Sequence, residues 1–279
     1  MNSIASERRP PLARFLSMEI ARRYGIFLFL VLLIAVSGAG SPTFLRIDNV
    51  VNMLVQFAPL GIVVIGQVFV ILVGGLDLSV ASVMATAAVI ATAFDGTNAA
   101  APAIFGATFV MCLFAGLLNG LLVTKRQVSP FLATFATAIV LQGMRFAYTQ
   151  GAPSGNVPPL FHTMGTGAVG GVPVNVLMLA ACAVVFGVLL HLSTFGRRVH
   201  MVGGNAESAR LVGVSPDTVR MVCYVISALL AGVAGLALSG YVGIVDNWVG
   251  RGFELDSIVA AVMGGLALSG GRGSLPGGL

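Results

Sequence analysis

The sequence from residue 195 to residue 220, FGRRVHMVGGNAESARLVGVSPDTVR, is the longest charged interval in a chain that is otherwise almost continuously apolar. Three of its residues delimit a short helix: Asn205 can cap the start, Gly213 can take the left-handed conformation after the end, and Pro216 prevents continuation. A helix of about two turns is unstable alone, because nucleation costs more than so few hydrogen bonds return. We therefore expect it to lie both on its own membrane domain and on a partner.

The composition of the chain around this stretch is that of a membrane protein. Of 279 residues, 57% are hydrophobic and 9% are charged, against roughly a quarter charged in soluble domains. The 36 glycines suit helices that approach one another closely. We predict an all-α, polytopic transmembrane bundle. The net charge of +5 is scattered between apolar runs, so nucleic acid is not an expected partner.

The hydropathy pattern predicts a basic cytoplasmic arm over 1–23 and a transmembrane domain over 24–279. The first apolar run is long and follows Arg22 and Arg23, so we expect a retained span rather than a cleaved signal peptide. Pro59 should bend or break the second span. About eight spans are predicted by apolar length, over residues 24–40, 50–73, 80–94, 102–123, 130–148, 174–192, 221–243 and 255–269.

The distribution of basic residues orients the predicted spans. With the amino terminus inside, the basic arm, the pair Lys125 and Arg126 and the loop 193–220 are all cytoplasmic. Only Arg46 and Arg251 fall in external segments. Because cytoplasmic loops of membrane proteins carry the excess of Lys and Arg, the opposite orientation is disfavoured.

Two segments of the chain have nearly the same sequence, which indicates an internal repeat. Residues 74–79 read GGLDLS and residues 264–269 read GGLALS. Transporters are often built from duplicated units with helix breaks at matching positions, although six residues of this composition can also match by chance. The predicted spans make the two copies parallel, and an inverted repeat would require a further span or a re-entrant turn.

Enzymatic motifs are absent from the sequence. The segment GGRGS at 270–274 lacks the spacing and the lysine of a phosphate-binding loop, and no zinc-protease or hydrolase pattern occurs. The cysteines Cys112, Cys182 and Cys223 lie in apolar runs without ligand spacing, as core residues do. We expect no catalytic residue, no metal site and no bound cofactor, and any ATP-Mg would be used by a separate protein.

A carboxylate interrupts the apolar sequence at Asp77, within the glycine-rich segment that also holds Gly74, Gly75 and Ser79. Burying it in a membrane costs roughly 2.5 to 3.5 kcal/mol on insertion scales. Asp77 is either an ion or proton site, or it caps, with Ser79, the helix that starts near Val80. We favour the cap, and both interpretations place a discontinuous helix beside a transport pathway.

Other polar groups within spans are Gln67, Asn119, Gln142 and Arg145. Such groups face the bundle interior or a wet cavity, where they form interhelical hydrogen bonds or contact a solute. Phe131 lies on the same predicted span as Gln142, and aromatic rings with amides suit sugars. Gln67, Asn119, Phe131 and Gln142 are therefore candidate substrate contacts.

Two carboxylates, Glu254 and Asp256, precede the last predicted span. Capping and compensation of the helix dipole explain both side chains. A role at the outer gate of a pathway is the alternative.

From about Phe44 to the end, the chain resembles the membrane-spanning permease subunits of bacterial ATP-binding-cassette sugar importers of the ribose type. Seven separated motifs occur in the order typical of that family. They are GGLDLSV at 74–80, GLLNG at 116–120, PF at 130–131, FGR at 195–197, GGNAESARL at 203–211, FELD at 253–256 and LSGGRG at 268–273.

The chain also departs from the pattern of those permeases. Ala81 stands where glycine is common, and Gln142-Gly143 stands where an Arg-Gly pair is usual. These differences bear on the substrate rather than on the fold. The chain ends at Leu279, whereas the family usually continues through further spans, so we expect a shortened protein.

The resemblance implies a multi-pass protein of the bacterial inner membrane that works as a homodimer. An external solute-binding protein would deliver the sugar, and a cytoplasmic ATPase pair would supply energy. The segment around 203–213 is similar to the coupling helix that docks on the ATPase, which points to Gly203, Gly204, Asn205, Glu207, Arg210 and Leu211. An ion-coupled carrier that uses Asp77 and a non-transporting membrane scaffold are the alternatives. Pentose, hexose, polyol and signalling sugars all fit as substrates.

Overall fold

The computed structural model describes residues 28–152 and 155–279, so the basic arm predicted over 1–23 lies outside the described residues. The chain divides into two compact units, Met1–Asn52 and Met53–Leu279. The first unit contains the apolar helix Leu28–Gly40, a turn, and the beginning of the next helix. The side chains of this first helix are largely exposed, among them Leu30 and Leu32, as expected for a segment in lipid.

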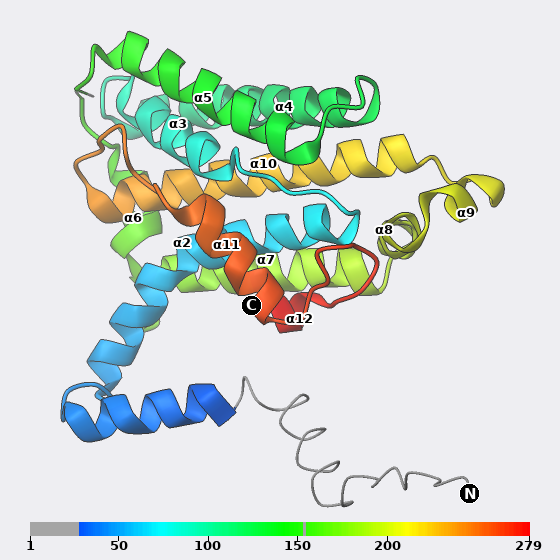
Figure 1. Cartoon of the computed structure of the whole chain (residues 1–279). Coiled ribbons are helices and arrows are strands. Elements are labelled where there is room, and N and C mark those ends of the chain that lie inside the picture. The colour runs from blue at the N-terminus through cyan, green and yellow to red at the C-terminus, as the bar shows by residue number, and fades with distance from the viewer. Residues whose placement is uncertain (1–27, 153–154) are drawn as a thin grey trace, which may run out of the picture. The chain divides into compact units, whose positions relative to one another are not determined.

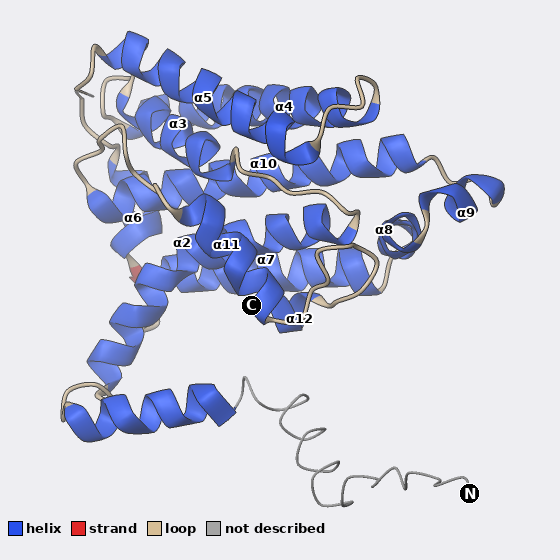
Figure 2. Ribbon diagram, in the orientation of Figure 1, coloured by secondary structure: helices blue, strands red, loops and turns tan. Residues whose placement is uncertain are grey.

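Helices make up most of the described structure and strands almost none of it, which confirms the all-α prediction (Figures 1 and 2). Two residues on each side of a turn form a small antiparallel hairpin, β1 (Ala168–Val169) with β2 (Val172–Pro173). The remaining elements are α2 (Ile47–Leu72), α3 (Val80–Thr92), the 3₁₀ turn η1 (Asn98–Ala100), α4 (Ala101–Thr124), α5 (Pro130–Thr149), α6 (Pro159–Thr166), α7 (Val174–His191), α8 (Thr194–Gly204), α9 (Ala206–Leu211), α10 (Pro216–Val242), α11 (Phe253–Met263) and α12 (Leu275–Gly278).

Among the described residues, five helical segments are long and apolar enough to cross a membrane: 47–72, 98–124, 130–149, 174–191 and 216–242. The other three predicted spans correspond to shorter helices, namely Leu28–Gly40, α3 and α11. The span expected over 255–269 is only partly helical, because the helix ends at Met263 before two glycines. The chain is therefore a multi-pass membrane protein in which some crossings are broken helices.

The two prolines have different outcomes. Of the bend or break predicted at Pro59, the break is absent, since α2 runs without interruption from Ile47 to Leu72. Pro216 lies beyond the end of α9, as predicted, and it also starts the next helix: it occupies the first turn of α10, where a missing N–H costs nothing. Ser215 caps that turn by accepting a hydrogen bond from the Thr218 N–H, so α10 begins five residues before the predicted 221.

Helix α10 lies at the centre of the second unit, with α3, α4 and α5 on one side and α2 and α7 on the other (Figure 1). Glycines permit this packing. A Cβ added to Gly116 of α4 would lie 2.6 Å from Cα of Val225, and one added to Gly120 would lie 2.9 Å from Cα of Met221. Gly116 and Gly120 thus form a close-approach face of α4, and its partner is α10.

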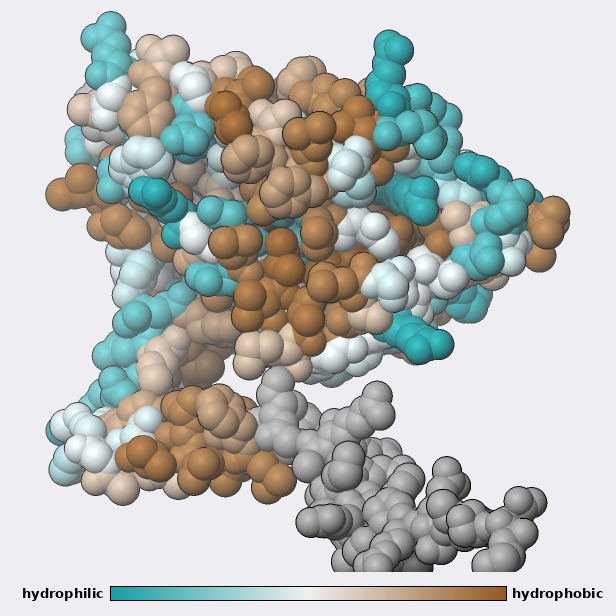
Figure 3. Space-filling view, viewed as in Figure 1, coloured by the Kyte–Doolittle hydropathy of each residue, from teal (hydrophilic) through white to brown (hydrophobic). Residues whose placement is uncertain are grey.

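The outward faces of the bundle are apolar. Figure 3 shows hydrophobic residues over α5 and α11 and hydrophilic ones toward α8 and α9. On α7, the buried residues are Asn175 and Leu190, and apolar side chains such as Val184 and Val185 are largely exposed. Lipid is the solvent that tolerates such faces.

The two GGLxLS segments end their helices in the same way, but one residue out of register. After α2, Gly74 has a φ of +78° and its N–H bonds to the Ile71 carbonyl. After α11, the equivalent position is the second glycine, Gly265, with a φ of +94° and a bond to Val262. The first segment leads into α3 and the second into a turn and α12, so the likeness is confined to the helix ends and duplication stays a prediction.

Candidate functional site

The helix break after α2 is the first component of the site. Helix α2 ends in a left-handed glycine, and the N–H groups of Gly74 and Gly75 bond to the carbonyls of Ile71 and Val70 at 2.9 Å. This pattern satisfies carbonyls at the helix end. The chain then returns through the bundle as an irregular segment before α3 begins (Figure 1). Irregular backbone at this depth requires partners from the protein, because lipid offers none.

At the centre of the break, the buried carboxylate of Asp77 accepts hydrogen bonds from the surrounding protein. Its Oδ1 accepts hydrogen bonds from the Ser79 backbone N–H (2.9 Å) and the Ser79 hydroxyl (2.5 Å). Its Oδ2 accepts one from the Ser227 hydroxyl of α10 at 2.8 Å. Asp77 is fully buried. The N-cap residue of α3 is Ser79, and no side chain makes a capping hydrogen bond to the first turn of that helix. Asp77 bonds to the Ser79 N–H ahead of the helix, so the predicted cap is not formed and the carboxylate orders the break instead.

A chain of buried hydroxyl and amide groups continues from Asp77 to α4 and α5. Asn119 donates to the Ser79 hydroxyl at 2.9 Å and accepts from the Thr137 hydroxyl at 2.6 Å. The Thr134 hydroxyl accepts from the Leu78 N–H at 3.1 Å. Each polar side chain here has a partner, so the network holds α3, α4 and α5 around the break.

Gln67 completes this arrangement from α2. With its amide nitrogen facing the Asp77 carbonyl, it donates to that carbonyl and accepts from the Asp77 N–H, each at 3.2 Å. Gln67 and Asn119 are both fully buried, and neither lines the pocket described next. These two candidate substrate contacts instead make the interhelical hydrogen bonds that were the alternative.

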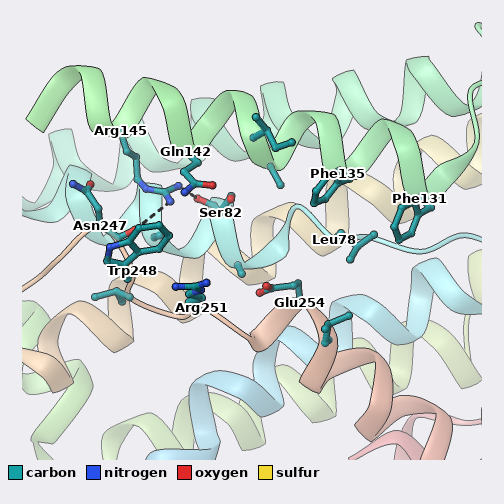
Figure 4. Close-up of a pocket in the computed structure, with 16 residues that line it drawn as sticks. Leu78, Ser82, Phe131, Phe135, Gln142, Arg145, Asn247, Trp248, Arg251 and Glu254 are labelled. Atoms are coloured by element: carbon teal, nitrogen blue, oxygen red, sulfur yellow. Dashed lines mark hydrogen bonds between the residues drawn. The ribbon is translucent and has the colours of Figure 1, made fainter. Parts of the chain in front are cut away.

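A pocket of about 450 Å³ opens between α3, α5, the loop after α10 and the start of α11. Three of the predicted site residues line it: Phe131 and Gln142 from α5, and Glu254 from α11 (Figure 4). Phe131 stacks with Phe135, which also lines the pocket, at 6.0 Å between ring centroids. Apolar side chains with a few polar groups are typical of small-molecule sites.

Arg145 fixes one wall of the pocket. Its Nη1 donates to the Ser82 carbonyl at 2.9 Å and to the Thr86 hydroxyl at 3.1 Å, both on α3. Its Nη2 donates to the Asn247 carbonyl at 3.3 Å. The planar guanidinium group can serve several acceptors at fixed angles, and here it ties the loop after α10 to α3 and α5 (Figure 4).

The loop after α10 contributes pocket residues that the sequence did not identify. Trp248 packs edge-on against Phe146 at 5.4 Å, and the guanidinium of Arg251 lies 4.8 Å from the centre of the Trp248 ring. Asn247 donates to the Thr149 hydroxyl at 2.9 Å, which holds the loop against α5. The one sequence signal was the only tryptophan of the chain, beside charged residues in an external loop.

The two carboxylates before α11 have different surroundings. Glu254 accepts a hydrogen bond from the Gly252 N–H at 3.0 Å, as a capping side chain does, while also lining the pocket. Asp256 is exposed in the first turn of α11 and does not line the pocket. Of the predicted gate pair, Glu254 is therefore the member placed to meet a solute.

The segment 193–220 forms two helices rather than one. Residues 194–204, expected to be loop, are α8. Gly203 and Gly204, predicted to belong to the coupling helix, are the last turn of α8 and lie outside α9. Asn205 caps α9 by accepting from the N–H groups of Glu207 and Ser208, each at 2.9 Å. Gly213 has a φ of +81°. The predicted start and end signals of the short helix are confirmed, and α9 is six residues long.

The outer face of α9 combines charge with exposed apolar side chains. Glu207 and Arg210 form an ion pair of 3.3 Å, and Arg210 also lies 3.9 Å from Asp217. Leu211 is 82% exposed and Val212 is 67% exposed. Among residues 28–152 and 155–279, none covers these two side chains, which is the property of a docking surface.

Known proteins resemble this chain over most of its length. The family model described as "Branched-chain amino acid transport system / permease component" matches residues 49–279. The ribose import permease protein RbsC of Bacillus subtilis is 36% identical over 262 residues, which is 92% of this chain and 81% of the relative. RbsC of Escherichia coli K12 is 32% identical over 89% of this chain and 78% of its own. The L-arabinose transport system permease protein AraH of Escherichia coli K12 is 29% identical over 95% of this chain and 81% of its own. No solved structure matches.

Proposed function

Because the chain belongs to the family of branched-chain amino acid transport system permease components, we propose that it forms the membrane pathway of a bacterial ATP-driven importer of a monosaccharide. The relatives named above are permeases for ribose and for L-arabinose, which favours a pentose. The chain itself carries no phosphate-binding loop, so ATP-Mg is hydrolysed by a separate subunit.

The ATPase docks on α9 at the cytoplasmic face of the inner membrane. This helix is capped at both ends and presents Glu207, Arg210 and Leu211 to the outside. An apolar side chain such as Leu211, exposed beside an ion pair, is suited to a groove with an apolar floor and a polar rim. The exposed, capped α9 is the single observation of this structure that carries the proposal.

The pocket beside α11 is the part of the pathway that accepts the sugar. Its volume of about 450 Å³ falls within the range of roughly 300 to 1,000 Å³ for ligand sites. Gln142 offers a donor and an acceptor for hydroxyl groups, and Arg251 and Glu254 add one charge of each sign. The loop after α10 lines the pocket and is predicted to be external, where a solute-binding protein would release its cargo.

Two copies of the chain enclose the pathway in this proposal. The exposed apolar faces of α4, α5 and α7 are available to lipid and to a second copy. ATP-driven closure of the ATPase pair would displace α9 and switch the spans between outward-open and inward-open states.

The proposal is tested by measuring sugar uptake under two conditions, one that removes ATP and one that removes the proton gradient. Cells that express the chain together with an importer ATPase and a solute-binding protein are supplied with radiolabelled ribose, L-arabinose or glucose. We expect pentose uptake that stops when ATP is depleted and continues when a protonophore collapses the proton gradient. Uptake that survives ATP depletion and collapses with the protonophore would contradict the importer and support an ion-coupled carrier.

The ion-coupled alternative has a specific structural difficulty. Both oxygens of Asp77 already accept hydrogen bonds from Ser79 and Ser227, and the pocket does not reach this carboxylate. A non-transporting scaffold would show no uptake under either condition in the experiment above.

A further inference from the structure

Three backbone segments that are distant in sequence meet at the end of α2. The first segment is the end of α2 with Gly74, and the second is the last turn of α8. The third is the glycine pair Gly270-Gly271 in the turn after α11. The Gly271 N–H donates to the carbonyl of Leu72, the last residue of α2, at 2.9 Å. This bond satisfies a carbonyl that a helix end would otherwise leave unpaired.

Glycine is required at each contact of this junction. A Cβ added to Gly203 of α8 would collide with the Leu72 carbonyl and lie 2.5 Å from the Gly271 nitrogen. One added to Gly270 would lie 2.9 Å from the Gly74 nitrogen, and one added to Gly271 would lie 2.6 Å from the Gly204 nitrogen. The three segments therefore touch through backbone atoms, with no flexible side chain between them.

Helix α8 also contacts α2 at a second point, near its start. The ring of Phe195, near the start of α8, stacks on Phe69 of α2 at 6.5 Å with an angle of 22°. Val199 and Val202 of the same helix are buried. Because a close-packed contact shifts as a unit rather than deforming gradually, displacement of α8 must also displace the end of α2.

The junction connects the proposed docking helix to both halves of the site. Asn205, the cap of α9, follows Gly203 and Gly204 directly. Beyond Leu72, the chain enters the break that contains Asp77, and the Gly270-Gly271 turn follows α11, which carries Glu254 of the pocket. We propose that Gly203 is a positioning residue for transport, through which movement of α9 reaches the α2 break and the α11 turn.

This inference depends on the proposed importer function, and the chain offers a matched pair of variants to test it. Gly203→Ala places a methyl group against the Leu72 carbonyl, whereas a Cβ at the adjacent Gly204 meets nothing within 4 Å. Both replacements are in the last turn of α8 and favour helix formation alike. Any difference between them therefore reports the contact.

The measurement is the coupling ratio, meaning sugar transported per ATP hydrolysed, in proteoliposomes that contain the chain, its ATPase and the binding protein. We expect Gly203→Ala to keep ATPase assembly and hydrolysis within twofold of the unmodified protein while the coupling ratio falls at least tenfold. Gly204→Ala, whose added methyl group meets nothing within 4 Å, should keep a coupling ratio at least fivefold above that of Gly203→Ala. Equal ratios for the two variants, or a proportional loss of uptake and hydrolysis, would overturn the proposal.

Hydrogen exchange on the unmodified transporter covers the case in which Gly203→Ala does not fold. Peptides that span 70–76, 198–212 and 266–273 are compared between the nucleotide-free and ATP-trapped states. We expect all three to change exchange rate together by at least threefold, because they share one junction. A change confined to 198–212 would overturn the role of Gly203 but leave the importer standing, whereas failure of the ATPase to bind at all would overturn the proposed function.

Discussion

Ser227 on α10 donates a hydrogen bond of 2.8 Å to Oδ2 of Asp77, 150 residues earlier in the chain. The bond joins the central helix of the second unit to the break between α2 and α3. Together with the two bonds from Ser79, it gives each oxygen of a fully buried carboxylate a donor. Asp77 thus serves as an acceptor that organises the break.

Replacing Asp77 by asparagine should preserve that role, because the amide oxygen can accept from Ser79 and the amide nitrogen can face the Ser227 hydroxyl. We expect Asp77→Asn to transport within about threefold of the unmodified protein. Asp77→Ala should lose about 3 kcal/mol of unfolding free energy, since buried donors lose their acceptor at about 1 to 3 kcal/mol each. Thermal midpoints in detergent and uptake assays measure the two effects. Loss of uptake by a well-folded Asp77→Asn would point to a required negative charge.

Arg145→Lys tests the wall of the pocket. Lysine keeps the charge but cannot reach the acceptors on α3 and the Asn247 carbonyl in the same fixed geometry. We expect a loss of about 2 kcal/mol of stability and faster proteolysis of the loop 244–252. Protease mapping of intact and variant protein checks this. An unchanged cleavage rate would show that Trp248 and Asn247 hold the loop without the guanidinium.

Gln142→Ala tests the sugar contact. Loss of one hydroxyl-binding amide should raise KM for uptake about tenfold, which corresponds to about 1.4 kcal/mol, and change the maximal rate little. Gly143→Ala is the control, because a Cβ there meets nothing within 4 Å and the residue does not line the pocket. Equal KM values for both variants would remove Gln142 from the substrate site.

Replacing Glu207 and Arg210 together by alanine tests docking on α9. Their ion pair is 73% and 54% exposed, so its loss should cost less than about 1 kcal/mol of stability. We expect uptake and ATPase stimulation to fall at least tenfold while the thermal midpoint stays within about 2 °C. Unchanged uptake with unchanged ATPase stimulation would contradict docking through this helix.

Local sequence signals predicted local structure well. Asn205 and Gly213 delimit α9 as expected, because capping depends on residues two or three positions apart. The polar run before them concealed α8, since few apolar residues marked its helical period. The short α6 and the hairpin at 168–173 were likewise missed inside a loop rich in glycine and proline.

The pocket was only partly predictable because it depends on tertiary contacts. Phe131 and Gln142 were found, since polar and aromatic residues on one span are visible in the sequence. Gln67 and Asn119 are also polar residues within apolar spans, yet their amides hydrogen-bond to Asp77 and Ser79 in the break. The sequence pattern does not show which neighbour a buried amide contacts. Trp248 lines the pocket because contacts with Arg145 and Thr149 hold its loop against α5.

The irregular segment between α2 and α3 also constrains the order of biogenesis. Its Leu78 N–H bonds to Thr134, 56 residues later, and Asp77 bonds to Ser227, 150 residues later. A ribosome releases α2 and α3 long before it has made either partner, so these polar groups enter the insertion machinery unsatisfied. The α2–α3 pair must therefore wait in a protected or hydrated site until α5, and finally α10, arrives to close the break.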